Sequence, residues 1–223
     1  RWRGNLEAML PKPSKVAKNG NHAALPFAEA PAFMKHLRKM EGTGPRALEF
    51  TILTATRSGE VRGAKWDEID LEARVWTIPA DRMKMGKEHM VPLTAEAVAL
   101  LKALPKFEGN NLVFPASRGG ELSDMTLAAV IKRMHESETK AGRKGFIDPK
   151  QTDKNGNPKI ATPHGFRSTF RDWAGETTHH PREVIEHALA HQLKDKAEAA
   201  YARGSLFQKR QALMEDWAAY CAK

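Results

Sequence analysis

The sequence is poor in cysteine, in tyrosine and in long apolar runs, and each shortage excludes a class of protein. Its one cysteine, Cys221, has no partner for a disulfide within the chain, which suits a reducing compartment. No run of about 18 apolar residues occurs, so we expect no membrane span. The first residues also lack the charged-then-apolar pattern of a secretory leader. The shortages together predict a cytoplasmic protein.

The charge balance is basic. The sequence has 36 lysines and arginines against 27 aspartates and glutamates, which gives a formal net charge of +9. Counterions released from phosphates favour binding to such a protein, so the balance suggests a polyanionic partner. By itself this evidence is weak, because many basic proteins bind no nucleic acid. The 223 residues, 41% of them hydrophobic, are sufficient for one well-formed core.

The chain divides into two parts by composition. Residues 1–24 are polar, lysine-bearing and broken by proline and glycine, and we interpret them as a basic interdomain linker. The sequence starts at Arg1 without a methionine, and we interpret the chain as a piece of a longer protein. Residues 25–223 are expected to form one domain.

The periodicity of that domain is mainly helical. Two β-rich runs, 74–79 and 89–93, predict strands of a small antiparallel sheet, and residues 112–115 predict a buried extended segment. We therefore expect an α+β fold, mostly α-helical with a small antiparallel β-sheet. Apolar spacing and capping residues predict helices over about 28–40, from Pro45, after Ser58, from Thr94 to Leu101, over 123–137, from Thr162, from Pro181 to about His191, over 195–203 and over 206–221.

Residues 138–161 are polar and contain Asn155-Gly156, a strong turn signal. Asp153 begins a pattern similar to that of a calcium loop. Pro158 stands at the sixth position and His164 at the twelfth, where such a loop needs glycine and glutamate. We therefore predict a flexible loop or a hairpin and not a calcium site.

Six scattered residues suit the chemistry of a phosphodiester. Arginine forks, a lysine and imidazoles bind phosphate oxygens, and a tyrosine hydroxyl can attack the phosphorus. Glu60, three residues after the first arginine, is placed to orient it. The six are Arg57, Lys84, His164, Arg167, His191 and Tyr201.

Several of these residues also have an ordinary structural explanation. Arg57 can be a surface arginine paired with Glu60, and Arg62 is a nearby alternative to it. His164 can be a helix-capping residue, and Tyr201 can be a half-buried aromatic. No single member is informative without the others.

Two further patterns have to be weighed. His187 and His191 are four residues apart and can share a metal on a helix, with His179 and His180 nearby. A third ligand is not evident, so a zinc site is disfavoured. The other tyrosine, Tyr220, follows Leu213 and Trp217 at helical spacing, which indicates packing.

With these residues in this order, the chain resembles the catalytic domain of the tyrosine recombinases, the phage-integrase family, over about residues 25–223. Ala190 replaces the commoner glycine of the third motif, and residues 138–161 are longer than expected. Finer features of residues 10–15, 22–26 and 209–214 resemble integrases of prophages and genomic islands. The motifs are Ala55-Thr56-Arg57-Ser58-Gly59-Glu60, Met83-Lys84-Met85 before Val91-Pro92-Leu93, His164-Gly165-Phe166-Arg167, Leu189-Ala190-His191, and Ala199-Ala200-Tyr201.

The resemblance implies site-specific DNA recombination. Tyr201 would attack the scissile phosphate and form a 3′-phosphotyrosyl bond, with Lys84 as general acid and His164 as base or orienter. Arg57, Arg167 and His191 would stabilise the phosphate, with no metal, ATP or other cofactor.

The implied partners are double-stranded DNA attachment sites, DNA-bending accessory proteins and further copies of the chain in a tetramer. The helix over 206–221 would dock onto a neighbouring protomer or back in cis. Such integrases carry arm-binding and core-binding domains ahead of the catalytic domain, and we expect neither within these 223 residues. A type IB topoisomerase and a non-catalytic DNA-binding protein are the alternatives.

Overall fold

The computed structural model describes residues 22–191 and 206–223. Helices predominate and two small antiparallel sheets accompany them, which confirms the predicted α+β class. No helix within these two ranges combines the length and hydropathy needed to cross a bilayer. The elements are η1 (Phe27–Glu29), α3 (Ala30–Arg38), α4 (Thr43–Thr54), α5 (Ser58–Arg62), η2 (Trp66–Glu68), β1 (Ile69–Asp70), β2 (Val75–Ile78), η3 (Ala80–Arg82), β3 (His89–Pro92), α6 (Ala95–Ala103), α7 (Thr126–Lys140), β4 (Ile147–Thr152), β5 (Pro158–Ile160), α8 (Gly165–Thr177), α9 (Arg182–Ala188) and α11 (Phe207–Cys221).

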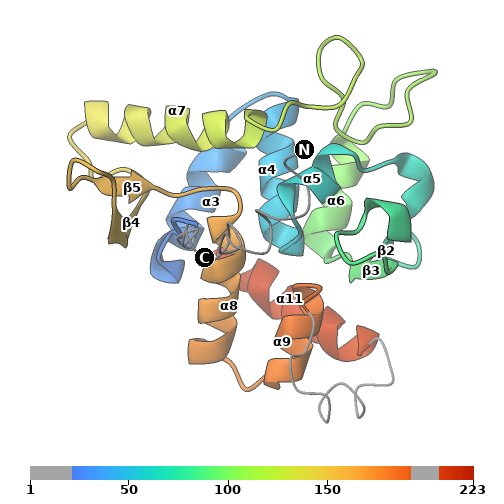
Figure 1. The fold of residues 1–223 in the computed structure, drawn as a ribbon. Coiled ribbons are helices and arrows are strands. Elements are labelled where there is room, and N and C mark those ends of the chain that lie inside the picture. The colour runs from blue at the N-terminus through green and yellow to red at the C-terminus, as the bar shows by residue number, and fades with distance from the viewer. Residues whose placement is uncertain (1–21, 192–205) are drawn as a thin grey trace, which may run out of the picture.

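Helix α4 is the centre of the core (Figure 1). Every residue from Ala47 to Thr54 is buried, and the helix contacts α3, α5, α6, α7 and α11. A helix that is buried on all sides needs apolar residues around its whole circumference. Its one buried carboxylate, Glu49, accepts hydrogen bonds from Arg38 at 2.8 Å and Arg46 at 2.5 Å. These partners offset the cost of burying a charge.

The predicted strands at 74–79 and 89–93 are confirmed as β2 and β3, which pair antiparallel. A third strand, β1, pairs with the other edge of β2 and was not predicted, because two residues are too few to show a periodicity. Lys84 lies on the connection between β2 and β3, as expected. Residues 112–115 are buried at Val113 and Phe114 as expected, but they form no continuous strand: Leu112 and Pro115 make isolated β-bridges, and the chain bends at the two residues between them.

The helix boundaries follow local capping where capping residues exist. The Thr94 side chain accepts a hydrogen bond from the Ala97 amide at 3.2 Å at the start of α6. Thr162 does the same for the Gly165 amide at 3.0 Å before α8. The expected extension of α9 to His191 is wrong: the helix ends at Ala188, and Ala190 has a φ of 47°. A left-handed residue cannot continue a right-handed helix.

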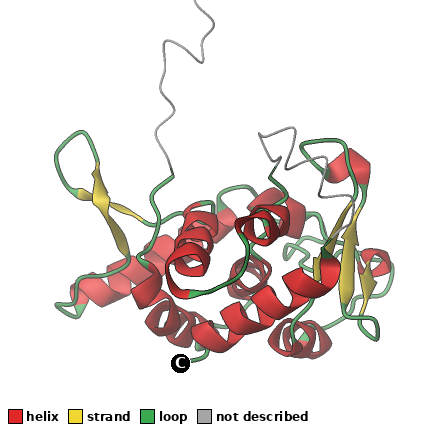
Figure 2. Cartoon of the chain, turned by 90° about the horizontal axis from the view of Figure 1, so that it is seen from below, coloured by secondary structure: helices red, strands yellow, loops and turns green. Residues whose placement is uncertain are grey.

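Residues 138–161 continue α7 and then form the β4–β5 hairpin, one of the two predicted forms. Asp153 uses its carboxylate within the turn, accepting from the amides of Asn155 at 2.8 Å and Asn157 at 2.9 Å. Figure 2 shows this hairpin and the β1–β3 sheet at opposite ends of the molecule.

The C-terminal helix α11 packs in cis. It contacts α3, α4, α8, α9 and β3, and the indole of Trp217 donates to the Ile52 carbonyl at 2.8 Å. Leu213, Met214 and Trp217 are buried. Exchange of this helix between protomers concerns an assembly and stays a prediction. The expected helix over 195–203 and most of the expected linker lie outside the described residues.

Candidate active site

Arg57 is placed by the turn between α4 and α5. Helix α4 ends at Thr54, and the next residue, Ala55, has a φ of 51° that redirects the chain so that Arg57 precedes the first residue of α5. The buried carboxylate of Glu60 accepts from the Arg57 amide at 2.8 Å and from its guanidinium at 2.7 Å. The predicted orienting contact is therefore present. The alternative, Arg62, instead donates to the Leu122 carbonyl at 2.8 Å.

Arg167 lies in the first turn of α8 and is only 4% exposed. Its guanidinium donates to the carbonyls of Ala55 and Leu189 and contacts His191 Nε2 at 3.2 Å. Its Nε has no hydrogen-bond partner among the described residues. Burial, followed by repulsion from Arg57, lowers the pKa of Arg167 to about 10. Two neighbouring guanidinium groups in a partly desolvated place attract an anion.

His191 follows the left-handed turn at Ala190. Its Nδ1 lies 2.7 Å from Glu186 Oε2, and Glu186 also accepts from Arg171 at 2.7 Å. Because the Arg167 guanidinium only donates, His191 Nε2 accepts there and Nδ1 carries the proton donated to Glu186. Burial lowers the pKa of His191, while the hydrogen bond to Glu186 acts in the opposite direction.

This geometry weakens the zinc hypothesis. His187 belongs to α9 but His191 lies beyond its end, so the two do not share a helical face. In residues 22–191 and 206–223, no three His, Cys, Asp or Glu side chains are grouped to hold a metal ion.

His164 immediately precedes α8, with its side chain exposed and without a capping hydrogen bond. Burial of part of the ring lowers its pKa to about 4, and coulombic effects of His22, Arg167, Arg57 and His191 act in the same direction. A histidine with so low a pKa is neutral at pH 7 and can accept a proton.

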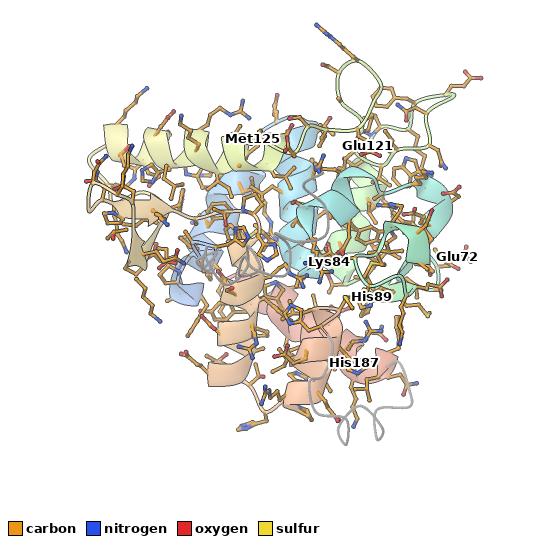
Figure 3. The ribbon with its side chains drawn as sticks, viewed as in Figure 1. Glu72, Lys84, His89, Glu121, Met125 and His187 are labelled. Carbon is orange, nitrogen blue, oxygen red and sulfur yellow. The ribbon has the colours of Figure 1, made fainter. Side chains whose placement is uncertain are left out.

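The remaining two of the six residues are Lys84 and Tyr201. Lys84 is exposed on the β2–β3 connection, and Figure 3 places it on the side of that connection nearest α4 and α5. Tyr201 lies outside the described residues. The other tyrosine packs as predicted: the Tyr220 ring stacks on Trp217 with centroids 6.0 Å apart, and its hydroxyl donates to the Phe27 carbonyl at 3.3 Å.

Two neighbours of the cluster were not predicted. Glu186 orients His191, as described above. His89 on β3 has a pKa lowered to about 4 by burial and then by the charges of Arg210 and Arg167, against a hydrogen bond with the Ala188 backbone. The only sequence signal for Glu186 was a carboxylate among the apolar residues of a short helix, and for His89 no signal existed.

Comparisons with known proteins identify the family of the chain. Residues 24–205 match the model of the phage integrase family. The prophage integrase IntZ of Escherichia coli K12 is 32% identical over 218 residues, which are 96% of this chain and 48% of that protein. The integrase of enterobacteria phage P4 is 31% identical over 221 residues, 92% of this chain and 46% of that protein. The chain thus spans about half the length of these relatives.

Solved structures share the fold at low sequence identity. The integrase of mycobacterium phage Brujita has a TM-score of 0.57 at 16% identity, covering 99% of this chain and 69% of that one. A lambda integrase, solved as a tetramer bound to a Holliday junction, has a TM-score of 0.53 at 17% identity, covering 82% and 49%. With the family model matched over most of its length and curated relatives above 30% identity, the chain belongs to the phage integrase family.

Proposed function

We propose that this chain is the catalytic part of a tyrosine-type site-specific DNA recombinase that integrates or excises a prophage or genomic island. The observation that carries the proposal is the pair of guanidinium groups on Arg57 and Arg167. Their mutual repulsion, in a place where Arg167 is buried, is relieved by a bound anion such as a DNA phosphate. Membership of the phage integrase family supports the same conclusion.

The proposed reaction exchanges one phosphodiester for another. The Tyr201 hydroxyl oxygen attacks the scissile phosphorus and loses its proton to His164, whose low pKa keeps it neutral and able to accept. The bond from phosphorus to the 5′-oxygen breaks, and Lys84 supplies the proton that completes the 5′-hydroxyl. The enzyme keeps the 3′-phosphate as a phosphotyrosyl ester. Attack by a new 5′-hydroxyl reverses the steps and joins the strands.

Arg57 and Arg167 stabilise the non-bridging oxygens as their charge increases in the transition state. His191 can donate from Nε2 only as an imidazolium, because Glu186 already receives the Nδ1 proton. An anionic phosphate favours that protonated form. These positive groups supply the charge that a metal ion provides in other phosphoryl-transfer enzymes, so the proposal needs no metal, ATP or other cofactor.

The proposed partners are double-stranded DNA attachment sites and further copies of the chain. One lambda integrase relative was solved as a dimer on a core site and another as a tetramer on a Holliday junction. For this protein we propose a tetramer on DNA, with α11 exchanged between protomers there, and DNA-bending accessory proteins. The reaction would take place on the nucleoid in a bacterial cytoplasm.

A covalent trap tests the proposal. The full-length protein is mixed in EDTA with a nicked duplex that carries the attachment sequence, quenched with denaturant, digested with nuclease and analysed by mass spectrometry. A nucleotide on Tyr201 is expected, and Tyr201→Phe should remove the adduct while leaving DNA binding unchanged. Tyr220→Phe is the matched control and should retain it.

The other outcomes are equally informative. An adduct on Tyr220 would disprove the assignment of the nucleophile but keep the enzyme class. DNA binding without any adduct would support a binding-only protein. Relaxation of supercoiled plasmid without strand exchange between attachment sites would favour a topoisomerase.

A further inference from the structure

Residues 22–25, called the strap here, lie across the start of α8. The Ala23 carbonyl accepts from the Thr162 amide at 2.9 Å and from its hydroxyl at 3.2 Å. The Ala24 amide donates to the buried carboxylate of Asp148 at 2.9 Å, at the base of the β4–β5 hairpin. The Leu25 carbonyl accepts from Thr169 at 2.6 Å. Four hydrogen bonds thus fix the strap from both sides.

The strap approaches α8 so closely that only glycine fits beneath it. A Cβ atom on Gly165 would lie 1.9 Å from the Ala23 carbonyl oxygen and 2.9 Å from the Ala24 Cα. Both are backbone atoms, which cannot move aside as a flexible side chain can. Gly175, near the other end of the same helix, has nothing within 4 Å of such an atom. The glycine after His164 is therefore required by the strap and not by the helix.

The strap ends at the candidate active site. The ring of His22 lies against that of His164, with centroids 4.2 Å apart and planes inclined at 47°. The His164 side chain makes no hydrogen bond within the described residues, so this ring contact is its principal side-chain restraint. Neither the strap nor His22 has a part in the mechanism proposed above.

We infer that His22 is a positioning residue for the proposed cleavage: it holds the His164 ring in the orientation that receives the Tyr201 proton. The inference rests on the proposed function. A misplaced general base loses rate without loss of substrate affinity, because only the transition state needs its orientation.

The charges around His164 give the inference a second observable. His22 faces it from the strap, Arg167 from α8, Arg57 from the start of α5 and His191 from the segment after α9. Removal of His22 uncovers more of the His164 ring and removes the coulombic effect of His22, and both changes raise the pKa of His164. A base with a raised pKa becomes protonated at a higher pH. The pH below which the cleavage rate falls should therefore be higher in the variant than in the unsubstituted protein.

The test uses His22→Ala, His22→Phe, Gly165→Ala and Gly175→Ala in the full-length protein. Single-turnover cleavage of the nicked attachment-site duplex and its equilibrium affinity are measured from about pH 3.5 to 8, a range that includes the His164 pKa of about 4, and the His164 ring is titrated by NMR without DNA. We expect His22→Ala to cleave about tenfold more slowly at pH 7 with its affinity changed less than about twofold. His22→Phe restores the ring contact and should recover most of the rate.

Gly165→Ala should reproduce His22→Ala in both the rate and the His164 titration, whereas Gly175→Ala should behave as the unsubstituted protein. Equal rates and equal His164 titrations in His22→Ala and the unsubstituted protein would overturn the inference. A loss of affinity at an unchanged rate would also overturn it and make His22 a DNA-binding residue. If the unsubstituted protein forms no covalent complex, the proposed function fails, and the NMR titration alone decides whether His22 controls His164.

Discussion

The candidate site joins a buried region around Arg167 and an exposed region around Lys84, and the fold restrains the two to different degrees. Arg167 is fixed by two carbonyl groups and His191, and Glu60 and Glu186 orient its neighbours. Lys84 lies on a connection whose residues 84–88 are all exposed. No described residue accepts a hydrogen bond from its ammonium group.

The difference corresponds to what each group has to do in the proposed reaction. Charge stabilisation is effective when the donors are oriented before the transition state forms, because no reorganisation is then required. A general acid has only to reach one leaving oxygen, so it can be positioned when DNA binds. We therefore expect substitutions in the buried region to alter both stability and chemistry, and those on the β2–β3 connection to alter chemistry alone.

The largest expected effect is that of Arg167→Lys. A lysine cannot donate to the Ala55 and Leu189 carbonyls together, and each unpaired buried carbonyl costs about 1–3 kcal/mol. Cleavage in the covalent trap should fall by a factor on the order of 10²–10³, and the urea midpoint should fall with it. Arg62→Lys, outside the cluster, is the matched control and should lose neither. Unchanged stability in Arg167→Lys would contradict the pre-formed site.

The next effect is that of Lys84→Ala, which should slow cleavage by about 10²-fold, the usual contribution of a general acid. Its urea midpoint should not change. A substrate with sulfur in place of the bridging 5′-oxygen needs no proton on departure, so it should restore cleavage by Lys84→Ala but not by Arg167→Lys. Lys87→Ala, on the same connection, is the control. Failure of the sulfur substrate to restore cleavage would remove Lys84 from the role of acid.

These two regions also differ in how far the sequence predicts them. Arg57 and Glu60 are three residues apart at the start of a helix, so their contact follows from local geometry, and Lys84 between two β-rich runs is equally local. Glu186 escaped prediction because the pattern of residues 181–191 suggests one continuous helix. Only the left-handed φ at Ala190 turns His191 back toward that carboxylate.

His89 escaped for a different reason. A half-buried strand such as β3 has the same pattern whether its histidine has a functional role or only packs in the sheet. The groups that lower its pKa, Arg210 and Arg167, are far away in the sequence. Contacts of this kind depend on the tertiary fold and have no local signal.

A smaller effect is expected from Glu186→Gln. The amide cannot stabilise an imidazolium as a carboxylate does, so protonated His191 becomes less favourable. Cleavage at pH 7 should fall by about tenfold, and the loss should shrink at lower pH, where His191 is protonated without help. Glu183→Gln, one turn earlier on α9, serves as the control. A loss that is independent of pH would mean that Glu186 is needed only to hold Arg171.

The smallest effect on cleavage is expected from His89→Asn. His89 lies between the two regions, because β3 adjoins the Lys84 connection and His89 contacts the end of α9. The pKa of His89 is lowered from 6.5 to about 4, so the unfolded chain binds a proton in this interval that the folded chain does not. The contribution of His89 to the free energy of unfolding is therefore fully present above about pH 6.5 and is lost as the pH falls toward 4. This contribution is about 3 kcal/mol at most. In urea unfolding at pH 7 and pH 4.5, His89→Asn should lose part of the difference between the two conditions, because His164 and His191 also have lowered pKa values, and His179→Asn should keep the whole difference. Because His89 has no part in the proposed chemistry, cleavage at pH 7 should change less than about threefold. A loss as large as that of Lys84→Ala at unchanged stability would show instead that β3 positions the general acid, and that the exposed region is held in place by the buried one.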